Sequence, residues 1–440
     1  MRDLVVTLVV FGLLPLILWR PWLGILVWSW LGYMNPHRLT WGFATEMHFA
    51  LMVAVVTLVA MLASREPKRI PWTRETILLL VLIGWMFMTT WFALVQAPAW
   101  EQWDKVWRVM LMTYVTMMLI TDEHRIKMLM FVIALSLGFY GFKGGVFVLS
   151  GGSAHAVMGP AGSFIADNNS VGLALIMTVP LLRFMQLQMT RPYVRYALLG
   201  GIALTLIAIV GTHSRGALLG VAVMLLFYLL KSRKKFAAIL AVIPLSLVML
   251  YVMPQEYFER METIQTWEED KSASERVRAW GNAIDLANER FVGGGMRALV
   301  YYGGRDSHSI YFGMLGEHGW VGLGMFLLLL FFTWRSGSWI ISHTRQREDL
   351  LWAKDLAAMV QVSLVGYMSA GAFLGLQYFD LFYHLVAIIV VTRVLLQQRF
   401  QEEEKSRVVA RKSDASQVKD NQPPRARAPR RGTAVLGESR

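Results

Sequence analysis

Three polar segments of this sequence carry the side chains best suited to chemistry. The segment 212–216 (THSRG) places Arg215 at the start of an apolar stretch, a later polar segment carries Arg276 and Arg278, and His308 precedes another apolar stretch. A guanidinium is a planar, permanently charged fork that suits phosphate oxygens. Histidine is the side chain best matched to proton transfer near neutral pH. Together they indicate a site that binds an anion and moves a proton.

Each of these residues also has a simpler interpretation. Arg215 is at a position where arginines commonly anchor a helix by reaching to lipid headgroups. Arg276 and Arg278 fit a solvated basic face balanced by nearby acidic residues. One histidine among nine, such as His308, is weak evidence when taken alone. The residue types therefore need support from the elements that position them.

The composition predicts a helical membrane protein. Of the 440 residues, 55% are hydrophobic and only 17% are charged. Apolar runs of about 16–25 residues, the length that crosses a hydrocarbon core, recur along the chain. Cysteine is absent, which excludes disulfides and thiolate metal sites. Much of the net charge of +13 lies in short loops and the C-terminal segment, so we expect no nucleic-acid partner.

The apolar runs predict an all-α fold with about twelve transmembrane helices. They cover residues 4–19, 22–36, 46–63, 76–94, 107–120, 128–150, 171–187, 196–210, 215–230, 236–253, 309–333, 355–374 and 380–398. The first two runs are short and separated only by Arg20 and Pro21. They predict either one broken helix or a tight hairpin.

The basic loops set the orientation. Segments 64–74, 231–235 and 335–354 are rich in lysine and arginine, and the positive-inside rule assigns all three to the cytoplasm. The organisation that follows is a first set of transmembrane helices, an outer loop with short helices, a second set of helices and a basic, disordered cytoplasmic tail. Their bounds are 1–253, 254–308, 309–398 and 399–440.

The outer loop contains one clear helical pattern. Residues 272–287 show helical periodicity, with a predicted buried face made by Val277, Trp280, Ile284 and Ala287. Arg276 and Arg278 lie near the N-terminal end of this helix, where the helix dipole favours an anion. The spacing does not decide which of the two arginines faces a substrate.

Nucleotide and metal motifs are missing from the sequence. There is no Asp-x-Asp, no His-Glu-x-x-His and no glycine-rich phosphate loop with its lysine. We therefore expect a reaction without metal or cofactor, on a donor that is already activated and lipid-linked.

Taken together, the motifs resemble the O-antigen ligase and polymerase superfamily of bacterial membrane glycosyltransferases. The matching pieces are 212–220 (THSRGALLG), 274–280 (SERVRAW), 291–295 (FVGGG), 308–311 (HSIY) and 316–322 (GEHGWVG). Residues 34–38 (MNPHR) look like a subgroup of O-glycosylation ligases linked to exosortase systems. The family usually has asparagine after the loop histidine, where this chain has Ser309.

The resemblance implies a function at the periplasmic face of the inner membrane. The donor would be a glycan on undecaprenyl pyrophosphate, and the acceptor of an O-antigen ligase is the lipid A–core oligosaccharide. His308 would be the catalytic base. The pyrophosphate would be bound by Arg215 and Arg276, with weaker support for Arg278.

Other functions remain open at this stage. The same residues would serve a polymerase that extends the glycan or a ligase that modifies protein Ser or Thr. A transporter or lipid flippase with intramembrane Lys143, Arg183 and Glu317 is the alternative from another class. Such proteins often show internal repeats, and no clear repeat is visible here.

Overall fold

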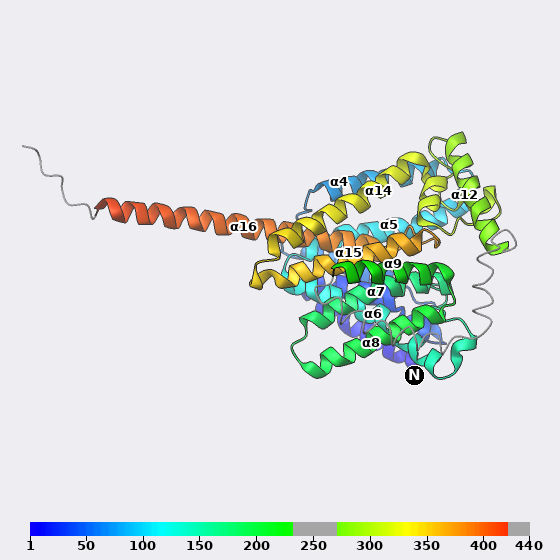
Figure 1. The fold of residues 1–440 in the computed structure, drawn as a ribbon, viewed down its shortest axis with the longest axis horizontal. Coiled ribbons are helices and arrows are strands. Elements are labelled where there is room, and N and C mark those ends of the chain that lie inside the picture. The colour runs from blue at the N-terminus through cyan, green and yellow to red at the C-terminus, as the bar shows by residue number, and fades with distance from the viewer. Residues whose placement is uncertain (232–270, 421–440) are drawn as a thin grey trace, which may run out of the picture. The chain divides into compact units, whose positions relative to one another are not determined.

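The computed structural model describes residues 1–231 and 271–420, and their regular structure consists of helices without a strand (Figure 1). The predicted all-α class is confirmed for these residues. The chain divides into a large unit, Met1–Val394, and a C-terminal unit, Leu395–Arg440.

Within the described residues, seven helices are long and apolar enough to cross a membrane. They are α1 (Arg2–Trp19), α4 (Arg74–Trp91), α6 (Glu123–Leu149), α7 (Asn168–Gln188), α8 (Pro192–Gly211), α14 (Ile310–Thr344) and the first part of α16 (Asp380–Asp420). The other long helices are α2 (Trp22–Met34), α3 (Phe49–Ala63), α5 (Gln96–Leu119), α9 (Arg215–Lys231) and α15 (Leu351–Gly371). The membrane class is therefore supported, while the total of about twelve spans stays a prediction. The span predicted at 236–253 lies outside the described residues.

The first two apolar runs form two helices arranged as a hairpin. Arg20 has an extended backbone (φ −134°, ψ 90°), as expected for a residue that precedes proline. The Asp3 carboxylate, at the start of α1, accepts hydrogen bonds from the N–H groups of Gly42 (3.0 Å) and Ala44 (3.2 Å). Since residues 42–44 follow α2, the start of α1 lies near the end of α2.

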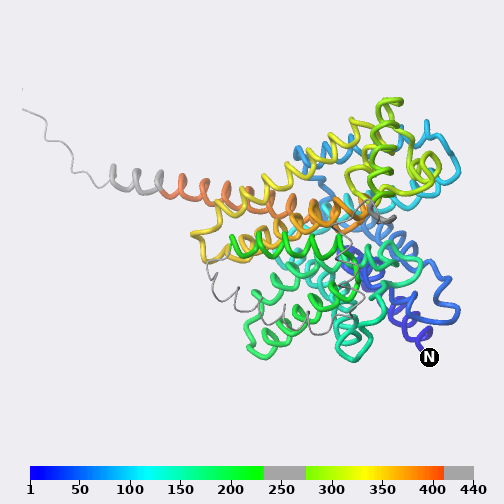
Figure 2. Tube along the Cα trace, turned by 45° about the vertical axis from the view of Figure 1, so that its right-hand side comes forward, coloured from blue at the N-terminus to red at the C-terminus, as the bar shows by residue number. Residues whose placement is uncertain are grey.

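The helices around the expected site pack through α15. This helix lies between α14 on one side and α9 and α7 on the other (Figures 1 and 2). Side-chain caps fix where α7 and α14 begin. Asp167 accepts from the N–H groups of Asn169 and Ser170 (both 3.0 Å), and Ser309 accepts from Phe312 N–H (3.5 Å). A cap of this kind contributes about 1 kcal/mol.

The predicted loop helix exists, but its buried face is shifted. Helix α12 (Lys271–Glu289) lies against the first part of α14, and the short α13 (Ala298–Tyr302) follows it (Figure 2). Val277 and Ile284 are 48% and 37% exposed, whereas Trp280 is half-buried and Ala287 is buried, so the predicted face is wrong only in part. Ala279, Ala283 and Leu286 are buried together with Ala287, and Ala283 and Leu286 pack on Ala298 and Leu299 of α13.

The tail prediction needs a correction as well. Helix α16 continues to Asp420, so residues 399–420, which we assigned to a disordered tail, are helical. This part of the sequence has no proline or glycine, and pairs such as Arg399 with Glu403 (3.3 Å) join neighbouring turns. Residues 421–440 lie outside the described residues.

Candidate functional site

Helix ends from distant parts of the sequence meet beside one connection, residues 372–379, which joins α15 to α16. Gly216, at the start of α9, packs so closely on Phe373 that an added methyl carbon would lie 3.0 Å from its Cβ. Gly375 likewise adjoins His308, whose Cα would be 3.5 Å from such a carbon. The segments that carry Arg215 and His308 therefore border the same connection.

A cavity of about 160 Å³ lies among these helix ends. It is lined by Asn169, Glu275, Arg276, Arg305, Asp306 and His308. The structure thus brings together Arg276 and His308, which the sequence predicted as an anion-binding residue and a base. Arg305 forms an ion pair with Glu275 on the same wall. The arrangement can bind an anion next to a group able to accept a proton.

Trp280 explains why Arg276 and His308 share this cavity. The two α12 residues Arg276 and Trp280 are four positions apart and so lie on one side of the helix. The Trp280 indole N–H donates to the Ser307 carbonyl (3.0 Å), and its ring stacks on Phe312 with the centroids 4.9 Å apart. The tryptophan docks α12 on the loop before α14, which places Arg276 beside the residue that follows Ser307.

His308 occupies a tight turn at the start of α14. Its backbone is left-handed (φ 46°), a conformation that few residues other than glycine adopt. Ser307 on one side donates to the Ser309 carbonyl (3.2 Å), and Ser309 on the other side caps the helix. The His308 side chain is exposed and has no hydrogen-bond partner in the part of the chain that the structure describes. The imidazole is therefore available to a substrate.

The other two predicted arginines lie elsewhere. Arg278 is exposed and does not line the cavity. Arg215 is half-buried at the start of α9 and is not among the lining residues either. The loop before it is held by Asn168, whose side-chain amide donates to the Thr212 carbonyl (2.9 Å). The neighbour of Asn168 is Asn169, so the segment that carries Arg215 is held next to a residue of the cavity wall.

Four lining residues were not predicted. Glu275, Arg305 and Asp306 adjoin Arg276 and His308 in the sequence, and this adjacency was the available signal. Asn169 does not adjoin them in the sequence, because it comes from the start of a different helix. Only the packing of α7 beside these loops reveals it.

Comparison with known families agrees with these motifs. Residues 200–327 match the family model described as O-Antigen ligase, a range that includes Arg215, Arg276 and His308. The match covers less than half of the chain and supports the resemblance to the O-antigen ligase and polymerase superfamily. Residues 1–190 match a family of unknown function (DUF5935). No curated protein matches the chain significantly. The predicted resemblance is confirmed, and the proposed subgroup stays a prediction.

Two further motifs, 291–295 and 316–322, form one structural unit. Helix α14 is broken at Gly319, whose backbone angles (φ 68°, ψ −174°) only glycine adopts readily. The glycine run 293–295 docks on the break. Gly294 N–H donates to the Gly316 carbonyl and Gly295 N–H to the Glu317 carbonyl, both at 2.9 Å. The run thus bonds backbone groups of the broken helix, which cannot be left unpaired.

The Glu317 side chain is buried and fully engaged by neighbouring groups. Its carboxylate accepts hydrogen bonds from the Arg297 backbone N–H (2.7 Å), from the Tyr378 hydroxyl and from the Gln377 amide at 3.5 Å. Burial, and then the nearby Glu317 carboxylate, raise the pKa of the Tyr378 phenol well above its usual range. The phenol therefore remains a hydrogen-bond donor.

The adjacent His318 extends this buried network. Its Nε2 lies 2.6 Å from the Tyr378 hydroxyl, and its Nδ1 lies 2.6 Å from the Thr89 hydroxyl. Its carbonyl accepts from the Trp85 indole N–H (2.8 Å). The network joins α4, α14 and the connection 372–379, which is a structural use of polar residues inside the bundle. These structural contacts account for a buried carboxylate at Glu317 without a transport function.

Proposed function

We propose that this protein is an O-antigen ligase. It would transfer a glycan from undecaprenyl pyrophosphate to a hydroxyl of lipid A–core oligosaccharide, in lipopolysaccharide biosynthesis. The observation that carries the proposal is the cavity in which Arg276 and His308, from separate segments, lie together. The match to the O-antigen ligase family supports the same class of reaction.

The chemistry follows from the lining groups. His308 accepts the proton of the acceptor hydroxyl, whose oxygen attacks the anomeric carbon of the donor sugar. The bond from that carbon to the pyrophosphate oxygen breaks on the opposite side, which inverts the anomeric configuration. Arg276 stabilises the charge that develops on the departing pyrophosphate, and Arg215 does so from the adjoining segment. No metal or cofactor takes part.

The position of the basic segments supports a periplasmic active site. The guanidinium of Arg74, in the basic segment 64–74, lies 3.4 Å from the hydroxyl of Ser336, in the last third of α14. His308 precedes the first residue of that same helix. The cavity and this basic segment therefore lie toward opposite ends of α14, and the positive-inside rule puts the basic end in the cytoplasm.

Cysteine labelling tests this orientation directly, since the chain has no native cysteine. In spheroplasts, a membrane-impermeant maleimide should label His155→Cys, which lies in the exposed loop before α7. It should label Arg69→Cys only after lysis. The reverse pattern would place the cavity in the cytoplasm and overturn the proposal.

The activity is tested with purified protein, an undecaprenyl-pyrophosphate glycan and lipid A–core, with EDTA and without nucleotide. Ligated product is expected, at a rate that EDTA does not change. Parallel reactions contain a serine- and threonine-rich protein or donor alone. Product only in the protein reaction would show an O-oligosaccharyltransferase, and lengthened donor would show a polymerase. Intact donor in every reaction would favour a flippase or transporter.

A further inference from the structure

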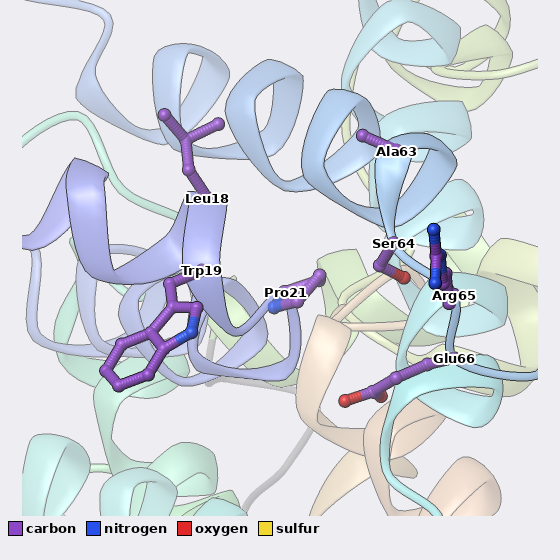
Figure 3. A pocket seen from close by; sticks show the side chains of 7 residues that line it. All are labelled: Leu18, Trp19, Pro21, Ala63, Ser64, Arg65 and Glu66. Carbon is purple, nitrogen blue, oxygen red and sulfur yellow. The ribbon is translucent and has the colours of Figure 1, made fainter.

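A second, larger cavity lies where the α1–α2 turn meets the end of α3 (Figure 3). Its volume is about 480 Å³, and it is lined by Leu18, Trp19, Pro21, Ala63, Ser64, Arg65 and Glu66. In Figure 3 the end of α3, with Ser64, Arg65 and Glu66, lies opposite Trp19 and Pro21. The proposed transfer reaction does not use this cavity.

One wall of the cavity belongs to the apolar surface of the bundle. Leu18 and Trp19 are 56% and 76% exposed, and Leu62 near the end of α3 is 71% exposed. All three are at the ends of apolar helices: Leu18 and Trp19 end α1 just before Arg20, and Leu62 comes just before the basic segment 64–74. Exposed tryptophan followed by basic residues is typical of the boundary between hydrocarbon and water. The cavity therefore lies where lipid headgroups are found.

The opposite wall is positively charged. Glu66 is ion-paired with Arg125, which holds both of its carboxylate oxygens (2.8 and 3.1 Å) and also pairs with Asp122 (3.0 Å). Lys68 remains at the rim, where its ammonium donates to the Ser64 carbonyl (2.7 Å). Arg65 is exposed and has no carboxylate partner within residues 1–231 and 271–420. An exposed guanidinium beside a carboxylate that is already ion-paired suits a phosphate group.

We propose that this cavity binds the phosphate headgroup of an anionic membrane lipid. Arg65 contacts the phosphate oxygens, with Lys68 adding positive charge at the rim. The acyl chains lie along Leu18 and Trp19. Free phosphate has the same kind of charge but no acyl chains. It would therefore contact only the wall that carries Arg65.

The test uses the full-length protein in detergent and measures binding of phosphatidylglycerol, phosphatidylcholine and inorganic phosphate. We expect phosphatidylglycerol to bind at least several-fold more tightly than either of the others. Arg65→Gln should weaken that binding about five-fold, the usual effect of one basic residue at an anionic lipid surface. Arg69→Gln is the matched control, because it removes one exposed charge from the same segment but none from the cavity wall.

Three results would overturn the proposal. Equal weakening by both substitutions would mean that phosphatidylglycerol responds to the general charge of the segment. Unchanged phosphatidylglycerol binding by Arg65→Gln would mean that the lipid does not bind in this cavity. Inorganic phosphate binding as tightly as phosphatidylglycerol would show an ion site in place of a lipid site. Unchanged thermal unfolding of Arg65→Gln would exclude loss of folding as the cause of weaker binding.

Discussion

The His308 cavity and the network around Glu317 lie within a few turns of one helix, yet their polar groups are held very differently. Glu317 accepts hydrogen bonds from three neighbouring groups, and His318 has a partner at each ring nitrogen. His308 has no such partner among the described residues and faces open space. A polar group that the protein satisfies completely stabilises the fold, whereas one left exposed in a cavity can bind a substrate.

This difference separates two kinds of polar residue in a membrane bundle. An ionisable side chain inside a membrane span suggests a functional site by default. Glu317 shows the other outcome, since its partners come from the loop around Arg297 and from the connection 372–379. Polar residues of neighbouring motifs thus divide into those bound by the protein, such as Glu317, and those left exposed, such as His308, which we propose as the reacting group.

The largest difference in transfer rate is expected between substitutions of the two nearby arginines of α12, of which one lines the cavity and the other does not. Arg276→Ala should lower glycan transfer about 100-fold, the usual loss when one preorganised charge-stabilising group is removed. Arg278→Ala should stay within about twofold of the wild type, as expected for an exposed surface change. Initial rates in the reconstituted assay measure both. Equal losses from the two substitutions would mean that the charge of the helix matters and the cavity does not.

Removing the carboxylate of the buried network should affect stability instead. Glu317→Ala leaves the Tyr378 hydroxyl and the Arg297 N–H without their acceptor, at a cost of about 3 kcal/mol in the free energy of unfolding. Glu317→Gln keeps the shape and one acceptor oxygen, so its cost should be about 1 kcal/mol. Thermal unfolding in detergent measures both variants. An unchanged melting temperature for Glu317→Ala would show that the network does not stabilise the fold.

The smallest expected effect concerns the contact that joins α12 to the His308 loop. Trp280→Phe keeps the stack on Phe312 but loses the bond to the Ser307 carbonyl, worth about 1 kcal/mol. Transfer should fall several-fold while the melting temperature hardly moves. Trp320→Phe is the control, since its indole N–H bonds only the exposed side chain of Asn288 (3.1 Å). Equal activity of the two variants would mean that Trp280 does not position the site.

The sequence predicted much of the fold because its signals are local. Apolar run length and periodicity gave the helical class and most helix positions, including the helix that carries Arg276. The face of that helix was wrong in part, because Ala279, Ala283 and Leu286 are buried while the more hydrophobic Val277 and Ile284 are exposed. The tail prediction was wrong for residues 399–420 because lack of apolar periodicity does not exclude a helix stabilised by ion pairs between turns.

The site was predictable only in part. Residue chemistry and motif resemblance selected Arg276 and His308, which the structure places in one cavity. The contribution of Asn169 depends on the packing of α7 against distant loops, and no local pattern encodes that packing. Glu317 looked like an uncompensated charge because its partners, Arg297 and Tyr378, are separated from it along the chain.

The most direct measurement compares two histidines ten positions apart, His308 and His318, each replaced by alanine. For His308→Ala we predict a loss of transfer of at least about 100-fold, with an unchanged melting temperature. For His318→Ala we predict a lower melting temperature, while the folded fraction still transfers glycan; His318→Asn serves if the alanine variant does not fold. Folded His308→Ala that transfers glycan at the wild-type rate would contradict the assignment of the His308 cavity as the site of transfer. So would folded His318 variants that lose transfer while His308→Ala keeps it.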